Sequence, residues 1–325
     1  MSKKEILVTD NLLSLKNEQD LRNEGFEVYR LPKHHIIEDE LIEALKGKAG
    51  YILGGIETVT EKVIESVDTL QAIVYNSTDY TVYIPAHDAA TKRGIAIANC
   101  PGSDSSATAE YALTIMLSMV RNVFDVGRTG KFTELMGRSL DELHIGIIGL
   151  GRIGRNFALL LKGLGVPRVS YYSRTRQETM ETELRIQYRP KDEILSSCDI
   201  ISIHTPRSAG VVLSEDDLAH ISDDGLVINV SYPDAVDLGA LVKEIKKGRL
   251  RAAFDFPPNN HFNEANTIPP GRFFWSNEYA GYNTTSVLRM IGDMATVSMI
   301  NLLKKGTDRN LVNPEYRNYR KDSMK

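Results

Sequence analysis

The chain has 325 residues, of which 39 are Lys or Arg and 43 are Asp or Glu, so its formal net charge is −4. Hydrophobic residues make up 42% and charged residues 25%, which is ordinary for a globular protein and unlike a disordered or fibrous one. The slightly acidic balance argues against electrostatic binding of nucleic acid, and no apolar run approaches the ~20 residues of a membrane-spanning helix. Two cysteines, Cys100 and Cys198, are too few for a disulfide framework, so we expect a cytoplasmic protein.

Short runs rich in Val, Ile and Tyr alternate with charged, helix-like segments in the first third of the chain. The strand-like runs are residues 6–8, 26–29, 51–53, 72–75 and 95–98. Between them, segments such as 38–46 carry apolar residues at helical spacing. Strands that are apolar at consecutive positions and separated by helices predict a parallel sheet covered on both faces. Right-handed crossovers then give a doubly wound layer.

A second series of elements begins after Pro101-Gly102. Its first element is a long helix predicted over residues 105–126, because Ala109, Ala112 and Met116 fall on one face. Strand-like runs follow at 144–148, 169–172, 199–203, 226–230 and 252–254, and a last long helix is predicted at 284–304, followed by a polar tail without a helical pattern. The chain therefore reads as two α/β domains with a boundary near residue 101.

A glycine motif follows the first strand of this second series. Gly149, Gly151 and Gly154 form the pattern GxGxxG between an apolar run and a helix-like segment, which is the context that dinucleotide binding requires. Gly149 allows a tight turn, Gly151 lets the backbone approach a pyrophosphate, and Gly154 lets the helix pack on the strand. The first turn of the helix, with Arg152 and Ile153, presents its amides to the anion. The motif predicts dinucleotide binding; the alternative is a tight turn that binds nothing.

The end of the next strand bears on the choice of dinucleotide. NAD sites usually place an Asp or Glu about 20 residues past the motif, where it accepts a hydrogen bond from a ribose hydroxyl. Here the chain has Ser173, Arg174 and Thr175, and then Arg176. A hydroxyl and a guanidinium suit a phosphate better than a ribose hydroxyl, so we predict a preference for NADP(H), with NAD still usable. The alternative is a pair of arginines exposed at a loop end.

Several further segments together resemble the D-isomer-specific 2-hydroxyacid dehydrogenases. They are residues 90–95, 99–102, 108–113, 198–206 and 253–256, which read ATKRGI, NCPG, TAEYAL, CDIISIHTP and AFDF. The resemblance covers nearly the whole chain. It implies an α/β fold of two doubly wound, Rossmann-like domains. A coenzyme domain, residues 102–286, is inserted into a discontinuous, flavodoxin-like outer domain, residues 1–101 plus 287–325, which receives the substrate.

The resemblance also assigns roles to residues of the coenzyme domain. It implies that Asp255 orients the nicotinamide carboxamide and that His204 lies beside the nicotinamide, where it serves binding and not proton transfer. Other residues that it places at the coenzyme are Thr108, Thr205, Pro206 and Ser231. A homodimer formed through the long helix of this domain is a further expectation from the family.

The sequence departs from the family at its three catalytic positions. The family uses an Arg to hold the substrate carboxylate, a His to transfer the proton, and a Glu to orient that His. In this chain the corresponding positions hold Tyr232, Glu278 and Asn260. Because a bidentate Arg and a proton donor each contribute orders of magnitude in rate, we do not expect ordinary reduction of a 2-keto acid by the family mechanism. The less cationic trio also predicts a pocket that does not select for an anionic carboxylate.

Each replacement has a chemical and a structural interpretation. Tyr232 is either a proton donor or an aromatic wall of the pocket. Glu278 is either a proton acceptor or partner of a cationic substrate, or a carboxylate that is solvated or paired with a neighbouring Arg. His261, beside Asn260, is either a group that approaches the site or a surface histidine. The histidines are scattered, and adjacent His34 and His35 point apart, so no metal site is predicted.

The sequence leaves two functions open. The first is an NADPH-preferring oxidoreductase that transfers hydride to a non-standard carbonyl, imine or activated alkene, with Tyr232, Glu278, Asn260 and His261 as candidate catalytic residues. The second is a catalytically inactive dinucleotide-binding sensor or scaffold. We favour the enzyme, because orienting a carboxamide through Asp255 matters mainly for hydride transfer. A small-molecule substrate is expected, and neither nucleic acid nor a membrane.

Overall fold

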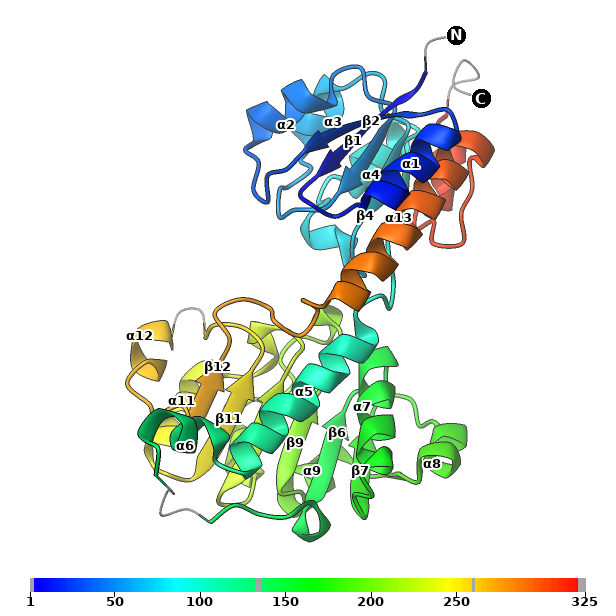
Figure 1. The fold of residues 1–325 in the computed structure, drawn as a ribbon. Coiled ribbons are helices and arrows are strands. Elements are labelled where there is room, and N and C mark those ends of the chain that lie inside the picture. The colour runs from blue at the N-terminus through cyan, green and yellow to red at the C-terminus, as the bar shows by residue number, and fades with distance from the viewer. Residues whose placement is uncertain (1–2, 132–135, 259–260, 321–325) are drawn as a thin grey trace. The chain divides into compact units, whose positions relative to one another are not determined.

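The chain folds into two compact units, each built on its own parallel sheet (Figure 1). The computed structural model describes residues 3–131, 136–258 and 261–320. Met1–Asp104 and Thr284–Lys325 form the first unit, and Ser105–Asn283 form the second. Because the first unit combines both ends of the chain, the second is an insertion within it.

The described part of the first unit holds a five-stranded parallel sheet in the order β2-β1-β3-β4-β5. Its strands are β1 (Glu5–Thr9), β2 (Glu27–Leu31), β3 (Gly50–Leu53), β4 (Ala72–Tyr75) and β5 (Ala96–Ala98). Every residue of β3, β4 and β5 is buried, whereas the edge strand β2 is largely open to solvent. This burial explains the apolar runs, because both faces of these three strands are covered. The order is that of a flavodoxin-like doubly wound layer.

Helices cover both faces of this sheet. They are α1 (Leu15–Asn23), α2 (Glu38–Leu45), α3 (Glu61–Ser66), α4 (His87–Lys92) and α13 (Thr285–Lys305). The last of these packs against α1, β3 and β4 (Figure 1). It is also the one helix of the described residues that is long and apolar enough to cross a membrane, and half of its apolar window is buried inside the protein. Packing within the unit therefore accounts for much of its apolar composition.

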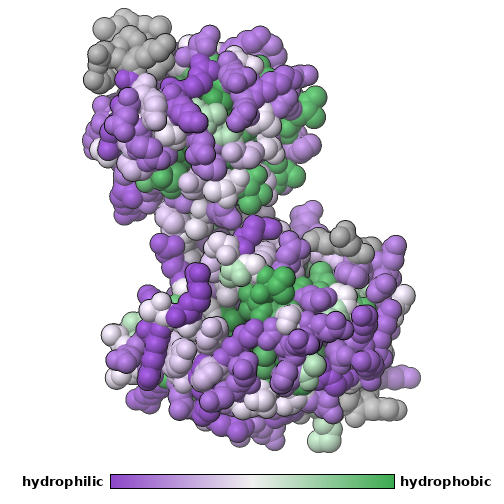
Figure 2. All heavy atoms as spheres, turned by 180° about the vertical axis from the view of Figure 1, so that it is seen from behind, coloured by the Kyte–Doolittle hydropathy of each residue, from purple (hydrophilic) through white to green (hydrophobic). Residues whose placement is uncertain are grey.

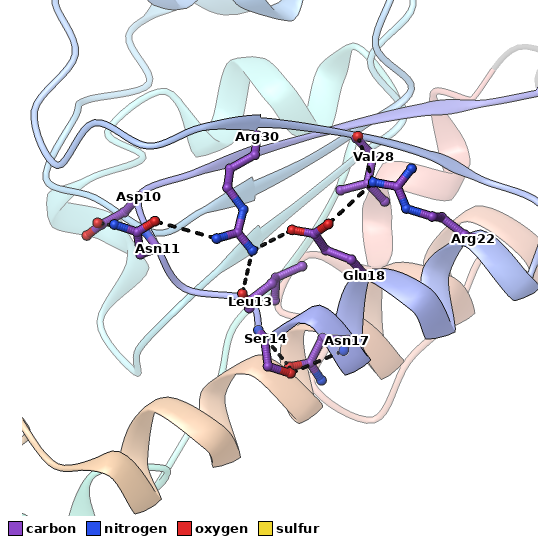
Figure 3. A network of polar contacts seen from close by, with 9 residues as sticks. All are labelled: Asp10, Asn11, Leu13, Ser14, Asn17, Glu18, Arg22, Val28 and Arg30. Atoms are coloured by element: carbon purple, nitrogen blue, oxygen red, sulfur yellow. Dashed lines mark hydrogen bonds and ion pairs between the residues drawn. The ribbon is translucent and has the colours of Figure 1, made fainter.

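A polar network joins α1 to β2 (Figure 3). Arg30 of β2 forms an ion pair with Glu18 of α1 and donates to the carbonyl oxygen of Leu13 at 2.6 Å. Ser14 caps α1 through a reciprocal pair of hydrogen bonds with Asn17. The Asn17 amide also donates to Asp293 of α13 at 2.7 Å. The network therefore fixes α1 between the sheet and the C-terminal helix.

The sequence shows no helical pattern in the polar tail after α13, but the structure has a short helix there. A 3₁₀ helix spans Pro314–Asn318, and Tyr316 within it is fully buried. The buried side chain of Asn313 accepts from the amide of Ile97 at 2.7 Å and donates to the carbonyl oxygen of Ile95 at 3.0 Å. One asparagine thus anchors the tail to β5. Because this anchor is a single polar residue, it leaves no periodic pattern in the sequence from which it could be predicted.

The described part of the second unit holds a seven-stranded parallel sheet in the order β12-β11-β10-β9-β6-β7-β8. The strands are β6 (His144–Ile148), β7 (Arg168–Tyr172), β8 (Gln187–Tyr188), β9 (Ile200–Ile203), β10 (Gly225–Asn229), β11 (Leu250–Phe254) and β12 (Phe273–Trp275). The short edge strands β8 and β12 are missing from the sequence prediction. The strand order reverses between β6 and β9, so the carboxyl ends of these strands open on the crevice where doubly wound sheets bind ligands.

The helices of this unit are α5 (Ser105–Val120), α6 (Val123–Thr129), α7 (Arg152–Gly163), α8 (Glu178–Leu184), α9 (Lys191–Ser197), α10 (Glu215–His220), α11 (Leu238–Lys246) and α12 (Phe262–Ala265). The helix predicted over 105–126 ends at Val120, because Asn122 adopts a left-handed conformation with φ 55° that breaks it. Two apolar clusters cover opposite faces of the sheet. Figure 2 shows that hydrophilic residues cover most of the visible surface, with hydrophobic residues gathered in a patch on this unit.

Candidate functional site

The three glycines of the turn between β6 and α7 differ in whether the fold itself requires them. Gly149 has φ +97°, and a Cβ there would stand 2.5 Å from the carbonyl oxygen of His204. A Cβ on Gly154 would stand 2.1 Å from the carbonyl oxygen of Gly149. The fold itself therefore needs glycine at both positions. A Cβ on Gly151 would meet no described atom within 4 Å, so the protein does not need glycine there. The open space at Gly151 leaves its backbone accessible from outside the protein.

The start of α7 offers that ligand free donors. Gly151 is the N-cap of this 12-residue helix and supplies no side chain to bond the first amides. The first turn contains no acidic residue, and the exposed Arg152 and partly buried Ile153 stand at its beginning. Unsatisfied amides and the positive end of the helix dipole both favour an anion at this point.

The loop after β7 distinguishes between its two arginines. Arg176 forms a paired salt bridge with Glu181, with Nε–Oε1 at 2.8 Å and Nη2–Oε2 at 2.9 Å. The exposed side chain of Arg174 has no hydrogen bond or ion pair with any described residue. The Ser173 hydroxyl donates to the carbonyl oxygen of Thr175 at 2.6 Å, which closes the turn. Arg174 is therefore the guanidinium that this loop leaves available.

Gln177, which belongs to none of the sequence motifs, connects this loop to the glycine turn. Its amide nitrogen donates to the carbonyl oxygen of Leu150 at 3.0 Å, and its oxygen accepts from Arg155. Its backbone amide donates to the hydroxyl of Tyr171 at 2.8 Å. Because these bonds span the glycine turn, α7 and β7, Gln177 fixes the loop of Arg174 beside the helix start. Its signal in the sequence is only its place three residues after Arg174.

His204 follows β9 and lies beneath the glycine turn. Its ring is buried against Phe157, with the centroids 5.0 Å apart, and its Nε2 lies 2.8 Å from the Ser202 hydroxyl. Burial lowers the pKa of His204 to about 3. The ring is therefore neutral at physiological pH and does not act as a general acid there.

The segment after His204 meets the end of β10. The Thr205 amide donates to the Ser231 hydroxyl at 3.0 Å, and that hydroxyl donates to the carbonyl oxygen of Ile203 at 2.9 Å. The Thr205 hydroxyl is buried and has no hydrogen-bond partner within the described part of the chain. A buried hydroxyl without a partner is costly, so one beside the glycine turn fits a site completed by a ligand.

Asp255, after β11, organises a second loop. Its Oδ1 accepts from the Ser276 hydroxyl at 3.1 Å and from the Ala280 amide at 2.7 Å, and its Oδ2 accepts from the Gly281 amide at 3.0 Å. Burial raises the pKa of Asp255 to about 6, although these three donors oppose the shift. A Cβ on Gly281 would lie 2.7 Å from Asp255 Oδ2 and 3.3 Å from the Cα of Thr108, so the loop also meets α5. The structure thus brings Asp255 and Thr108 together.

These residues fit a nicotinamide dinucleotide. The open space at Gly151 and the uncapped start of α7 suit the pyrophosphate, and the orphaned Thr205 hydroxyl belongs to a side chain that lies against Gly149. Three of the four hydrogen bonds to Asp255 end on Oδ1 and one ends on Oδ2, so Oδ2 has acceptor capacity left for a carboxamide.

Tyr232 stands where the family has its Arg, and its side chain is buried in the apolar cluster of the unit. Its hydroxyl donates to the carbonyl oxygen of Gly210 at 2.6 Å. For Tyr232 to act as a proton donor, this bond has to break. The role of Tyr232 stays a prediction, and the bond to Gly210 weighs toward a pocket wall. Arg207, which the sequence analysis passed over, lies with Cζ 5.5 Å from the centre of this ring.

The other candidate catalytic residues lie in loops. Glu278 is exposed in the loop that Asp255 anchors, and it forms no ion pair with a described residue. His261 lies beside the first turn of α11, where a Cβ on Gly239 would meet its ring at 3.3 Å, and Glu264 is 3.8 Å from its Nδ1. Asn260 lies outside the described residues. Their catalytic roles stay predictions.

No group of three or more His, Cys, Asp or Glu residues that could hold a metal ion occurs among residues 3–131, 136–258 and 261–320. Both cysteines are buried and free. Burial raises the pKa of Cys100 to about 12 and that of Cys198 to about 11, so neither is a thiolate near neutral pH.

Comparison with known protein families identifies the family of this chain. Residues 113–276, half of the chain, match the model of the D-isomer specific 2-hydroxyacid dehydrogenase, NAD binding domain. The chain belongs to the D-isomer specific 2-hydroxyacid dehydrogenases. As a member of this family it is an NAD(P)-dependent oxidoreductase, and its cofactor is a nicotinamide dinucleotide. The resemblance drawn from the sequence motifs is thereby confirmed.

Named relatives of this dehydrogenase include two enzymes. It is 28% identical to a glyoxylate reductase of Thermococcus gammatolerans over 258 residues, which are 73% of this chain and 75% of that protein. It is 29% identical to the D-3-phosphoglycerate dehydrogenase of Pongo abelii over 240 residues, which are 72% of this chain and 44% of that protein.

Solved structures agree in fold. A protein from Thermus thermophilus superposes with a TM-score of 0.81 at 25% identity, covering 95% of this chain and 99% of that chain. The NAD⁺-bound 3-phosphoglycerate dehydrogenase of Entamoeba histolytica gives a TM-score of 0.79 at 21% identity, with the same coverage. The predicted α/β fold with two Rossmann-type domains is confirmed.

Proposed function

We propose that this dehydrogenase prefers NADPH and transfers hydride to a carbonyl, imine or activated alkene. It does not bind this substrate through the arginine that its family uses. The observation that carries the coenzyme preference is the difference between the two arginines after β7. Arg176 is neutralised by Glu181, whereas Arg174 is exposed and unpaired among the described residues. The position where NAD sites place a carboxylate holds Ser173, whose hydroxyl closes its own turn.

Other residues of the chain bind and orient the coenzyme. The amides at the start of α7 bind the pyrophosphate, and Gln177 holds the loop of Arg174 against the glycine turn. Asp255 fixes the loop of residues 276–281 and accepts from the carboxamide, which orients the nicotinamide ring. The coenzyme supplies the hydride. Neutral His204 supports the turn from below and leaves proton transfer to another group.

The residue at the end of β10 limits how a substrate can be bound. Tyr232 stands at the position of the family's Arg with its hydroxyl donated to the backbone, so that position has no cation of its own. A substrate bound here is held by contacts other than the family's bidentate clamp. Because relatives are named glyoxylate reductases, glyoxylate belongs in any test together with neutral aldehydes, cyclic imines and activated alkenes.

The test is the loss of NADPH absorbance across this panel, with Lys243→Ala as the control variant. Lys243 is exposed on α11 and pairs with Glu215 of α10 at 3.9 Å. Turnover of any member by the wild type, slowed in Arg174→Ala and unchanged in the control, supports the proposal. NADPH binding without turnover across the panel points instead to a non-catalytic dinucleotide sensor or scaffold. The expected homodimer and cytoplasmic location stay predictions.

A further inference from the structure

Arg207 lies beside the position from which the family's arginine is missing. It follows Pro206 just after β9, and Tyr232 follows the neighbouring strand β10. Because the two strands are parallel neighbours, their carboxyl ends meet at one edge of the sheet. There the Cζ of Arg207 stands 5.5 Å from the centre of the Tyr232 ring. Arg207, from the loop after β9, therefore covers Tyr232, the residue that stands at the position of the family's arginine after β10.

The charge of Arg207 is still available to a ligand. Its side chain is 47% exposed, and its ion-pair partner among the described residues is Asp234, with Nη1–Oδ2 at 3.9 Å. That separation exceeds a hydrogen bond, and Asp234 is itself 79% exposed. Loose surface pairs of this kind contribute little, so a carboxylate with good geometry displaces Asp234 at small cost.

Tyr232 gives Arg207 a fixed support. Its hydroxyl donates to the carbonyl oxygen of Gly210, and the residue is only 3% exposed, so the aromatic face under the guanidinium does not move freely. A guanidinium over an aromatic face keeps its edge donors free for a planar anion. The tyrosine thus serves as the platform for a cation that another loop supplies.

The same loop leads to the coenzyme side of the unit. A Cβ on Gly149 would lie 3.0 Å from the Thr205 side chain, two residues before Arg207. The amide of Thr205 is fixed to the Ser231 hydroxyl, next to Tyr232. Residues 204–207 therefore run from the glycine turn to the end of β10, along the edge where the dinucleotide binds.

We propose that Arg207 binds a carboxylate of the substrate and so determines its specificity, in place of the arginine lost at position 232. This inference rests on the proposed function: the substrate carries an acid group, as the substrates of the family do, and the residue that binds this group is what differs. It replaces the sequence-based expectation of a pocket that does not select for anions. The guanidinium acts as a binding group, and no proton transfer is assigned to it.

The experiment measures equilibrium binding, so it does not depend on turnover. Wild type is first titrated with NADPH, and the complex is then titrated with oxamate, an anionic analogue of a 2-keto acid, and with the neutral diamide oxamide. The variants are Arg207→Met, which removes the charge, Arg207→Lys, which keeps the charge without the planar fork, and Asp234→Asn, which removes the competing carboxylate. Lys243→Met is the matched control, because Lys243 also forms a loose surface pair at 3.9 Å.

We expect Arg207→Met to weaken oxamate binding about 10–100-fold, the range of a lost charge-assisted hydrogen bond, while oxamide and NADPH binding stay unchanged. Arg207→Lys is expected to be intermediate, and Asp234→Asn to bind oxamate about 2–5-fold more tightly. A merely structural role of Arg207 would instead make Arg207→Met weaken oxamide and NADPH binding together with oxamate binding.

The outcomes separate the two proposals. If wild type does not bind NADPH, the proposed function fails and this inference fails with it. If NADPH binds but oxamate does not, or if Arg207→Met binds oxamate as wild type does, this inference alone is overturned. Equal losses in Arg207→Met and Lys243→Met also overturn it, because the effect is then one of general surface charge.

Discussion

Gly154 lies so close to Gly149 that a Cβ on the first would stand 2.1 Å from the carbonyl oxygen of the second. This clash would be with a backbone atom, so no side chain can move to relieve it. We expect Gly154→Ala to lower the free energy of unfolding by about 1–3 kcal/mol, as overpacking commonly does. Urea unfolding of the apoprotein measures this. An unchanged unfolding midpoint would mean that α7 packs on β6 less closely than the structure shows.

Gly151→Ala is the matched variant within the same turn. Its Cβ meets no described atom within 4 Å and its φ is negative, so the free energy of unfolding is expected to stay within about 0.5 kcal/mol of wild type. The methyl group instead occupies the space that the proposed function assigns to the pyrophosphate. We expect NADPH binding, followed by coenzyme fluorescence, to weaken at least about 10-fold. Coenzyme binding equal to that of wild type argues against a dinucleotide on this turn.

The buried Asp255 makes a prediction about pH. Its pKa is raised to about 6 from 3.8, so the folded state keeps a proton that the unfolded chain has already lost. The protonated group therefore favours folding below pH ~4, and this contribution disappears as the pH rises through about 6. Relative to Asp255→Asn, wild type should lose about 3 kcal/mol of free energy of unfolding between pH 4 and 7. The groups that face the carboxyl are Ser276, the amides of Ala280 and Gly281, and Tyr111.

Asp199 is a suitable control, because its pKa is shifted in the direction opposite to that of Asp255. Burial favours its neutral form, but the His144 amide and the Arg138 guanidinium outweigh this and lower its pKa. Asp199→Asn should therefore shift the pH dependence of stability in the other direction. If both variants shift it in the same direction, the assignment of a raised pKa to Asp255 is wrong.

Tyr232→Phe tests which of its two roles the tyrosine plays. The hydroxyl donates to Gly210 at 2.6 Å, so its loss should cost about 0.5–1.5 kcal/mol of stability. A proton donor contributes about 10²–10⁴ in rate, whereas a wall does not. We expect kcat to fall less than about 10-fold on whichever substrate is turned over. A loss of about 10²-fold or more in kcat, with normal NADPH binding, would identify Tyr232 as the proton donor.

The sequence was sufficient for the elements with strong patterns. The buried strands of both sheets appear as short runs rich in apolar residues, and the glycine turn has a spacing that its backbone geometry requires at Gly149 and Gly154. It was insufficient for features held by single polar residues. Asn122 ends α5 through a left-handed conformation, and Asn313 anchors the tail, and neither leaves a periodic signal.

The candidate site shows the same division. Motif spacing found Ser173 and Arg174, but only the ion pair between Arg176 and Glu181 distinguishes the available arginine from the neutralised one. Arg207 stands next to Pro206 in the sequence, yet its relation to Tyr232 depends on two strands that are parallel neighbours. Contacts between residues far apart in sequence carry this information, and motif spacing does not contain it.

The most direct test of the coenzyme assignment is the ratio of the dissociation constants of NADH and NADPH, measured for wild type and Arg174→Ala. Under the proposed function Arg174 binds the phosphate group that NADPH has and NADH lacks, so the wild type should bind NADPH at least about 10-fold more tightly. Arg174→Ala should bring the ratio close to one by weakening NADPH alone. A wild type that binds NADH as tightly as NADPH, or a ratio that Arg174→Ala leaves unchanged, would contradict the account.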